Sequence, residues 1–79
     1  MKRSEILERI RSTLSEIVDD PGLKLTEATT AKDVREWDSV NHVKLVIALE
    51  GQLGFRLDTD EISGPENVGE LIDLIQKKL

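Results

Sequence analysis

Aliphatic side chains recur every three or four residues in three stretches of this sequence, the spacing that places them on one side of an α-helix. They predict helices from about Ser4 to Val18, from Asp38 or Ser39 to about Leu53, and beyond Asn67. Residues 58–64 predict a further turn or two of helix. No alternating pattern is long enough for a sheet. The predicted fold is therefore all-α, a small antiparallel four-helix bundle with three long helices and a short third one.

A long polar segment, residues 23–37, separates the first two predicted helices. Pro21 and Gly22 end the first helix, because proline cannot continue the hydrogen-bond ladder. Within the segment, Thr30 and Asp33 have the spacing to cap a single helical turn. The residues expected to fix this loop to the core are Leu25, Ala31 and Val34.

The core is expected to consist of Leu, Ile and Val, since Trp37 and Phe55 are the only aromatic residues. At 79 residues the chain is expected to form one domain, 1–79, with a modest core. The predicted apolar face of the second helix comprises Val40, Val43, Val46, Ile47, Leu49 and Leu53, with Leu45 near its edge. That of the last helix comprises Val68, Leu71, Ile72 and Ile75.

Composition and charge narrow the possible functions. The formal net charge of −5 argues against nucleic acid as a partner, because phosphate contacts need clustered lysine and arginine. The chain has no cysteine, so neither a disulfide nor a thiolate metal site can stabilise it. Residues 1–17 are charged and amphipathic, unlike a signal peptide or a membrane span. We therefore expect a cytoplasmic monomer without membrane insertion.

The combination of Asp38, Ser39 and His42, the one histidine, suggests comparison with a hydrolase triad. Ser39 and His42 are three residues apart at the start of a helix, where ordinary surface neighbours meet. A working triad also needs a buried carboxylate, an oxyanion hole and a substrate cleft, for which a small chain has little room. One histidine and no cysteine leave only carboxylates as metal ligands. The sequence therefore favours neither a hydrolase nor a metal site.

Local sequence allows two interpretations of Ser39. At the first position of a helix, its oxygen lies beside unpaired backbone N–H groups and the positive end of the helix dipole. An attached anion such as a phosphodiester is favoured there. Aspartate and serine are also preferred N-cap residues, so a plain cap at Asp38 or Ser39 is the simpler interpretation. Local sequence leaves both open and favours the cap.

Several segments follow one another in a specific order along nearly all of the chain. An amphipathic helix and a long loop lead to "DSV" at the start of a second helix, which continues as "VKLVIALEGQLGFRL". A short acidic element and "NVGELIDLIQ" follow. Asp-Ser-aliphatic alone is common by chance, but its combination with the later segments is specific. In this order the sequence resembles the acyl carrier protein family.

The resemblance implies that Ser39 carries 4′-phosphopantetheine, donated by coenzyme A through a phosphopantetheinyl transferase. The thiol of that group would hold acyl cargo as a thioester, which makes the protein a carrier and not an enzyme. Asp38 matches the acidic residue before the modified serine, and Val40 the aliphatic residue after it. Positions that line the bundle interior in the family are matched by Val43, Val46, Ile47, Leu49, Leu71, Ile72 and Ile75.

Residues near Ser39 depart from the pattern of fatty-acid carriers, whose second helix usually presents an acidic face to basic enzymes. From residue 39 to 53 the formal charge is zero, so electrostatic steering by this helix should be weak. Trp37 stands where a small residue is common, and its simplest role is to clamp the loop onto the bundle. The residues expected to contact partners are Trp37, Val40, Asn41, His42, Lys44, Ile47, Glu61 and Ile62.

These departures indicate a specialised stand-alone carrier. The expected partners are the transferase and the ligases, acyltransferases or synthases of fatty-acid, polyketide or other specialised biosynthesis. An aminoacyl or peptidyl carrier loaded by an adenylating ligase is an alternative, because the chemistry of the arm is the same. A helical protein-interaction module with an unmodified Ser39 is another. Attempted modification of Ser39 distinguishes the carrier from the module.

Overall fold

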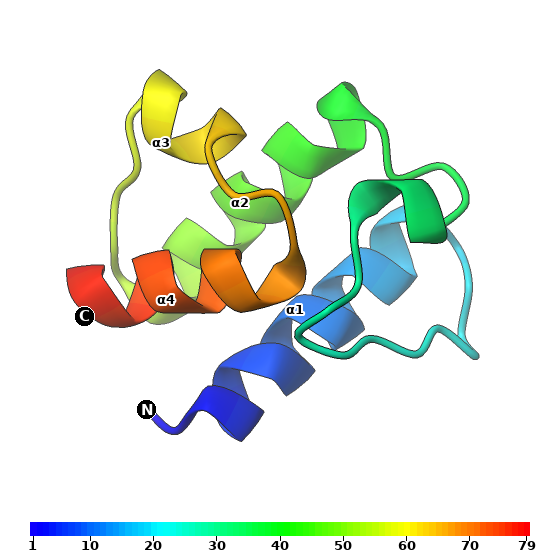
Figure 1. Ribbon diagram of the computed structural model, residues 1–79, viewed down its shortest axis with the longest axis horizontal. Helices are drawn as coiled ribbons and strands as arrows, with labels where there is room; N and C mark the ends of the chain where they lie inside the picture. Colours follow the sequence, from blue (N-terminus) through cyan, green and yellow to red (C-terminus); the bar gives the residue numbers. More distant parts are fainter.

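The computed structural model describes residues 1–79 and contains helices but no strands (Figure 1). The elements are α1 (Arg3–Ile17), a single 3₁₀ turn η1 (Ala31–Asp33), α2 (Ser39–Leu53), α3 (Thr59–Ser63) and α4 (Val68–Lys78). The segment between α1 and α2 passes the start of α4 before it reaches η1 (Figure 1). The predicted helical bundle, with a short third helix and a long first loop, is confirmed. No helix combines the length and the apolar character needed to cross a membrane.

Local capping explains why the helices begin and end close to their predicted limits. Asn67 accepts a hydrogen bond from the Glu70 backbone N–H at 2.8 Å and caps α4. Asp58 accepts one from Glu61 N–H at 2.8 Å and caps α3. Gly54 ends α2 with φ +76°, a left-handed conformation that glycine adopts without steric cost. These signals are short-range and are therefore visible in the sequence.

Sixteen buried hydrophobic side chains form one core between α1, α2 and α4. Full burial of one Leu, Ile or Val side chain contributes about 1.5–3 kcal/mol, so this core is the main source of stability. The three long helices supply Ile6, Ile10, Leu14, Leu45, Val46, Leu49, Val68, Leu71, Ile72 and Ile75, and the connecting segments supply Val18, Leu23, Val34, Trp37, Phe55 and Leu57.

The prediction for the core face of α2 was partly wrong. Val40, Val43 and Ile47 are 63%, 42% and 59% exposed, and Leu45 is fully buried rather than at the edge. The physical reason is that α2 carries aliphatic residues on two sides. Residues 40, 43 and 47 have helical spacing, as do residues 45, 46 and 49, so periodicity alone cannot separate the outer stripe from the core stripe. The expected interior positions of Val43 and Ile47 are therefore corrected.

The first loop is fixed to the bundle by backbone hydrogen bonds as well as by apolar contacts. The N–H groups of Val68 and Gly69 donate to the carbonyl oxygens of Thr29 and Glu27, at 2.9 and 2.8 Å. A Cβ at Gly69 would lie 3.1 Å from that Glu27 oxygen, so only glycine fits this close approach comfortably. Of the expected contacts, Val34 is buried and Leu25 packs against the core. Ala31 is exposed, which corrects the prediction.

Arg3 of α1 contacts both the first loop and α4 on the same side of the molecule. Its guanidinium forms ion pairs with Glu27 in the loop and Asp73 in α4. It also donates to the Gln76 side chain at 3.0 Å and to the Gly69 carbonyl oxygen at 3.2 Å. One side chain of α1 therefore joins the loop to α4, and the hydrogen bond with Arg3 lowers the pKa of Glu27.

Candidate functional site

Ser39 is the first residue of α2, and Asp38 caps the helix. One Asp38 carboxylate oxygen accepts a hydrogen bond from the Asn41 backbone N–H at 2.8 Å. Ser39 is exposed, and its hydroxyl has no hydrogen-bond partner in the chain. Of the two candidates for the N-cap, Asp38 therefore takes the role and leaves the Ser39 Oγ free.

Two backbone N–H groups beside the free hydroxyl also lack partners. Those of Ser39 and Val40 donate to no acceptor in the chain, whereas the His42 N–H donates to the Asp38 carbonyl oxygen at 2.9 Å. They lie at the positive end of the dipole of a fifteen-residue helix. At an exposed helix N-terminus an anion is stabilised by about 0.3–1 kcal/mol. The site therefore favours a negatively charged group on Ser39 Oγ.

The peptide that leads into α2 is held in an uncommon conformation. Glu36 has φ +67°, in the left-handed region that non-glycine residues seldom adopt. Its carbonyl oxygen accepts hydrogen bonds from the Asn41 side-chain amide at 2.7 Å and from the Asp38 N–H at 3.0 Å. These contacts fix the turn before Ser39. Glu36 could not be recognised from the sequence, because no local pattern marks a left-handed glutamate.

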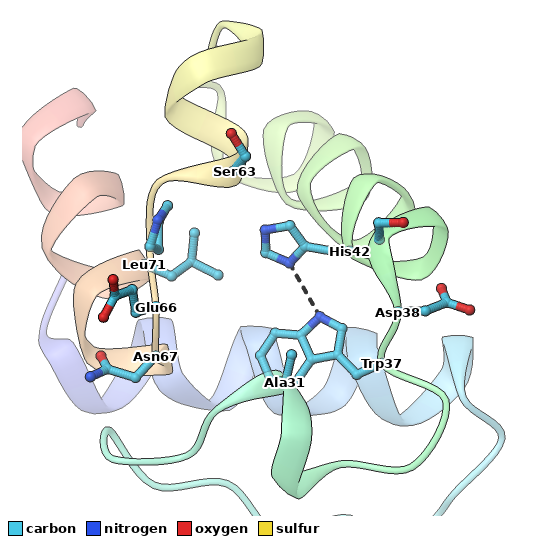
Figure 2. Close-up of a pocket in the computed structure, with 10 residues that line it drawn as sticks. Ala31, Trp37, Asp38, His42, Ser63, Glu66, Asn67 and Leu71 are labelled. Carbon is cyan, nitrogen blue, oxygen red and sulfur yellow. Dashed lines mark hydrogen bonds between the residues drawn. The ribbon is translucent and has the colours of Figure 1, made fainter.

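A hydrogen-bonded chain joins the loop, α2 and α3 through Trp37, His42 and Ile62. Trp37 is 7% exposed, and its indole Nε1–H donates to His42 Nδ1 at 3.2 Å (Figure 2). His42 Nε2 lies 2.8 Å from the Ile62 carbonyl oxygen. The indole nitrogen can only donate, so His42 Nδ1 is the acceptor. The ring hydrogen is therefore on Nε2, which donates a hydrogen bond to the Ile62 carbonyl oxygen. Trp37 therefore clamps the loop to the bundle, and His42 extends the clamp to α3.

The contacts of His42 differ from those that a catalytic triad of Asp38, Ser39 and His42 would need. Both ring nitrogens of His42 are engaged with Trp37 and Ile62, so neither is free to accept a proton from Ser39. Asp38 is exposed and caps α2 instead of orienting the imidazole. The three side chains thus lie close in sequence without the contacts that a triad requires. No group of three or more His, Asp and Glu side chains is placed to hold a metal ion.

A cavity of about 260 Å³ opens beside Ser39, between the start of α2, η1 and the α3–α4 connection. Figure 2 shows Trp37, His42, Leu71 and Ala31 around its centre, while the Asp38 carboxylate points away from it. Most of its wall is apolar. It is lined by Ala31, Trp37, Asp38, Ser39, His42, Ser63, Pro65, Glu66, Asn67 and Leu71.

The outer side of α2 carries an apolar stripe, defined here as Val40, Val43 and Ile47. Lys44 is exposed beside it. The one acid of α2, Glu50, accepts a hydrogen bond from the Leu57 N–H at 2.8 Å and is thereby used within the bundle. The stripe is therefore flanked by a cation and is not surrounded by acids from its own helix.

The two remaining predicted contact residues, on α3, are less available than those on α2. Glu61 forms an ion pair with Lys78 at 2.8 Å, and this hydrogen bond lowers the pKa of Glu61. The Ile62 side chain is half-buried and packs against the core. The structure thus brings Trp37, Asp38, Ser39, Val40, Asn41 and His42 together, with Lys44 and Ile47 further along α2 and Glu61 and Ile62 across from it on α3.

The chain is similar to known proteins in both sequence and structure. The chain is 36% identical over 74 residues to the acyl carrier protein of Saccharopolyspora erythraea, over 94% of this chain and 78% of that one. It is 31% identical over 80 residues to that of Thermosynechococcus vestitus, over 100% and 98%. The solution NMR structure of holo acyl carrier protein from Geobacter metallireducens has a TM-score of 0.80 and 33% identity, covering 91% of this chain and 83% of that one. No family model matches the sequence.

Proposed function

The chain belongs to the acyl carrier protein family, and on that premise we propose that Ser39 carries a covalent 4′-phosphopantetheine arm. The observation that supports this most directly is the free Ser39 hydroxyl, which is exposed because Asp38 takes the capping role. The residues present fit a phosphodiester, since two unpaired N–H groups lie beside that oxygen. When bound, the arm supplies a terminal thiol that holds acyl cargo as a thioester.

The residues around Ser39 would act by position rather than by catalysis. The unpaired N–H groups of Ser39 and Val40 would stabilise the phosphate charge. Asp38 would keep the helix start ordered while leaving the hydroxyl accessible to the enzyme that modifies it. In this proposal the protein has no catalytic activity of its own, residues 1–79 form one carrier domain, and the molecule acts as a monomer.

The apolar stripe of α2 would provide the contact surface for partner enzymes. Exposed aliphatic residues are of the type found at the centre of protein interfaces, and these lie within eight residues of Ser39 along α2. Lys44 and the neutral Asn41 would flank the contact, with the half-buried His42 beside them, whereas Trp37 is nearly buried and offers a partner little surface. Weak electrostatic steering implies partners that recognise shape more than negative charge. The proposed partners are a phosphopantetheinyl transferase and the ligases, acyltransferases or synthases that load and unload the arm.

Enzymatic modification tests the proposal. The protein is incubated with coenzyme A, magnesium and a broad-specificity phosphopantetheinyl transferase, and its intact mass is measured. We expect a gain of one phosphopantetheine, absent in Ser39→Ala and retained in Ser63→Ala. Ser63 is a suitable control because it is also an exposed serine that lines the cavity. No gain with several transferases, or an equal gain in Ser39→Ala, would refute the proposal. The ligase that loads the modified form then identifies the cargo class.

A further inference from the structure

The cavity beside Ser39 begins at the residue proposed to carry the arm, because Ser39 itself forms part of its wall. Building on the proposed function, we propose that this cavity binds the half of the pantetheine arm nearest the phosphate, with the Trp37 indole as its wall. The thiol end stays outside the cavity, where enzymes reach it.

The size of the cavity matches part of the arm and not all of it. An apolar protein cavity of about 150 Å³ takes up benzene, which has six carbon atoms. At the same density, 260 Å³ accommodates about ten non-hydrogen atoms. The pantoyl unit, with its dimethyl-substituted carbon, hydroxyl and first amide carbonyl, is of this size. The rest of the arm and any cargo exceed the space.

The chemistry of the wall matches the same unit. Trp37, Ala31, Pro65 and Leu71 supply apolar surface for the two methyl groups. Hydroxyl and amide side chains at Ser63 and Asn67 offer polar partners for a hydroxyl and an amide. The lining includes no lysine or arginine, and the Asp38 carboxylate points away from the cavity. A neutral amide-containing chain is therefore favoured over an anionic ligand in this space.

The wall is already formed in the unmodified protein. The indole of Trp37 is held by its hydrogen bond to His42, and His42 is held in turn by the Ile62 carbonyl oxygen. Binding therefore does not require these side chains to be ordered anew, which reduces its cost. Attachment at Ser39 also places the arm at an effective concentration in the millimolar range. A contact with a dissociation constant of about 1 mM is enough to keep the arm bound about half of the time.

Nuclear Overhauser effects provide a direct test on the full-length modified protein. Protein labelled with ¹³C and ¹⁵N is modified with unlabelled coenzyme A, so that the arm is the only unlabelled part. We expect cross-peaks from the two pantoyl methyl groups to the Trp37 ring and to the Leu71 methyl groups. Shift changes confined to residues 38–41, without such cross-peaks, would overturn the inference. In a second sample, modified with unlabelled acyl-coenzyme A, cross-peaks to the cavity from the acyl chain in place of the pantoyl methyl groups would also overturn it.

Fluorescence gives an independent readout, because Trp37 is the only tryptophan. Covering the indole should lower the acrylamide quenching constant of the modified protein about twofold relative to the unmodified protein. Ala31→Leu adds bulk inside the cavity and should abolish both this difference and the cross-peaks. Ala28→Leu makes the same change at an exposed loop residue outside the cavity and should preserve them.

Intact mass distinguishes a failure of the proposed function from a failure of arm binding. Each variant is compared as a form whose mass shows one attached arm, and circular dichroism verifies that it is folded. Absence of the mass gain refutes the proposed function. A mass gain at Ser39 without arm contacts, or an Ala31→Leu variant that retains them, refutes the binding of the arm alone.

Discussion

The hydrogen bond between Trp37 and His42 should appear as a coupling energy of about 1 kcal/mol in a double-mutant cycle. Trp37→Phe leaves His42 Nδ1 without its donor, and because His42 is half-buried, water can partly replace the bond. We expect this variant to lose about 1 kcal/mol of unfolding free energy through the hydrogen bond, and more through the gap that the smaller ring leaves in the core. A typical stability for 79 residues is about 4–12 kcal/mol, so such losses are measurable.

His42→Phe should cost about 2–4 kcal/mol, for two reasons. It leaves the nearly buried Trp37 N–H without an acceptor, and it removes the bond of 2.8 Å to the Ile62 carbonyl oxygen. In the double variant the Trp37 N–H is gone as well, so its desolvation penalty disappears. The double variant should therefore be less destabilised than the sum of the single variants by about 1 kcal/mol.

Urea denaturation of the unmodified protein, followed by far-ultraviolet circular dichroism, measures the four free energies without relying on the tryptophan signal. Equal slopes against urea concentration would show that the comparison is valid. Additivity of the two single variants within about 0.3 kcal/mol would refute the contact, since that is the behaviour of independent sites.

Three further predictions concern the rest of the fold. Leu45→Ala should lower the unfolding free energy by about 2–5 kcal/mol. Ile47→Ala should change it by less than about 0.5 kcal/mol and should instead slow the reactions of partner enzymes. Equal urea midpoints for the two variants would contradict this assignment of inner and outer positions. Gly69→Ala should accelerate hydrogen exchange of the residue 69 amide, because the added Cβ presses on the Glu27 oxygen; an unchanged rate would count against the close approach. Glu27 has a lowered pKa from its bond with Arg3, so its stabilisation is present above about pH 4.3 and is lost as the pH falls through the lowered value. Glu27→Gln should flatten that part of the stability curve measured by urea denaturation, and a curve identical to that of the parent would contradict the assignment.

The sequence was a good guide wherever a structural signal is local. Asp58 and Asn67 cap helices through hydrogen bonds to backbone groups three residues away, so the pattern of residues suffices to place these ends. The turn at Thr30 and Asp33 was predicted for the same reason. The cap at Asp38 also needs only residues 38 to 41, although the sequence could not choose between it and Ser39.

The failures arise where distant parts of the chain decide the outcome. Val43 and Leu45 are both aliphatic residues of α2, and only the positions of α1 and α4 determine that Leu45 is inside. His42 was predicted only as a partner-contact residue, because its acceptor on α3 is 20 residues away. The left-handed Glu36 depends on an amide from the next helix. No periodicity in the sequence encodes such contacts.

The position of Arg3 has a consequence for the order in which the molecule folds. Its partners Glu27 and Asp73 are 24 and 70 residues away along the chain. Contacts that close such long loops carry an entropic cost that is met only after shorter-range structure has formed. We infer that the Arg3 contacts are absent from the folding transition state. Arg3→Ala should then leave the folding rate nearly unchanged and accelerate unfolding, so that this residue governs how long a folded molecule persists.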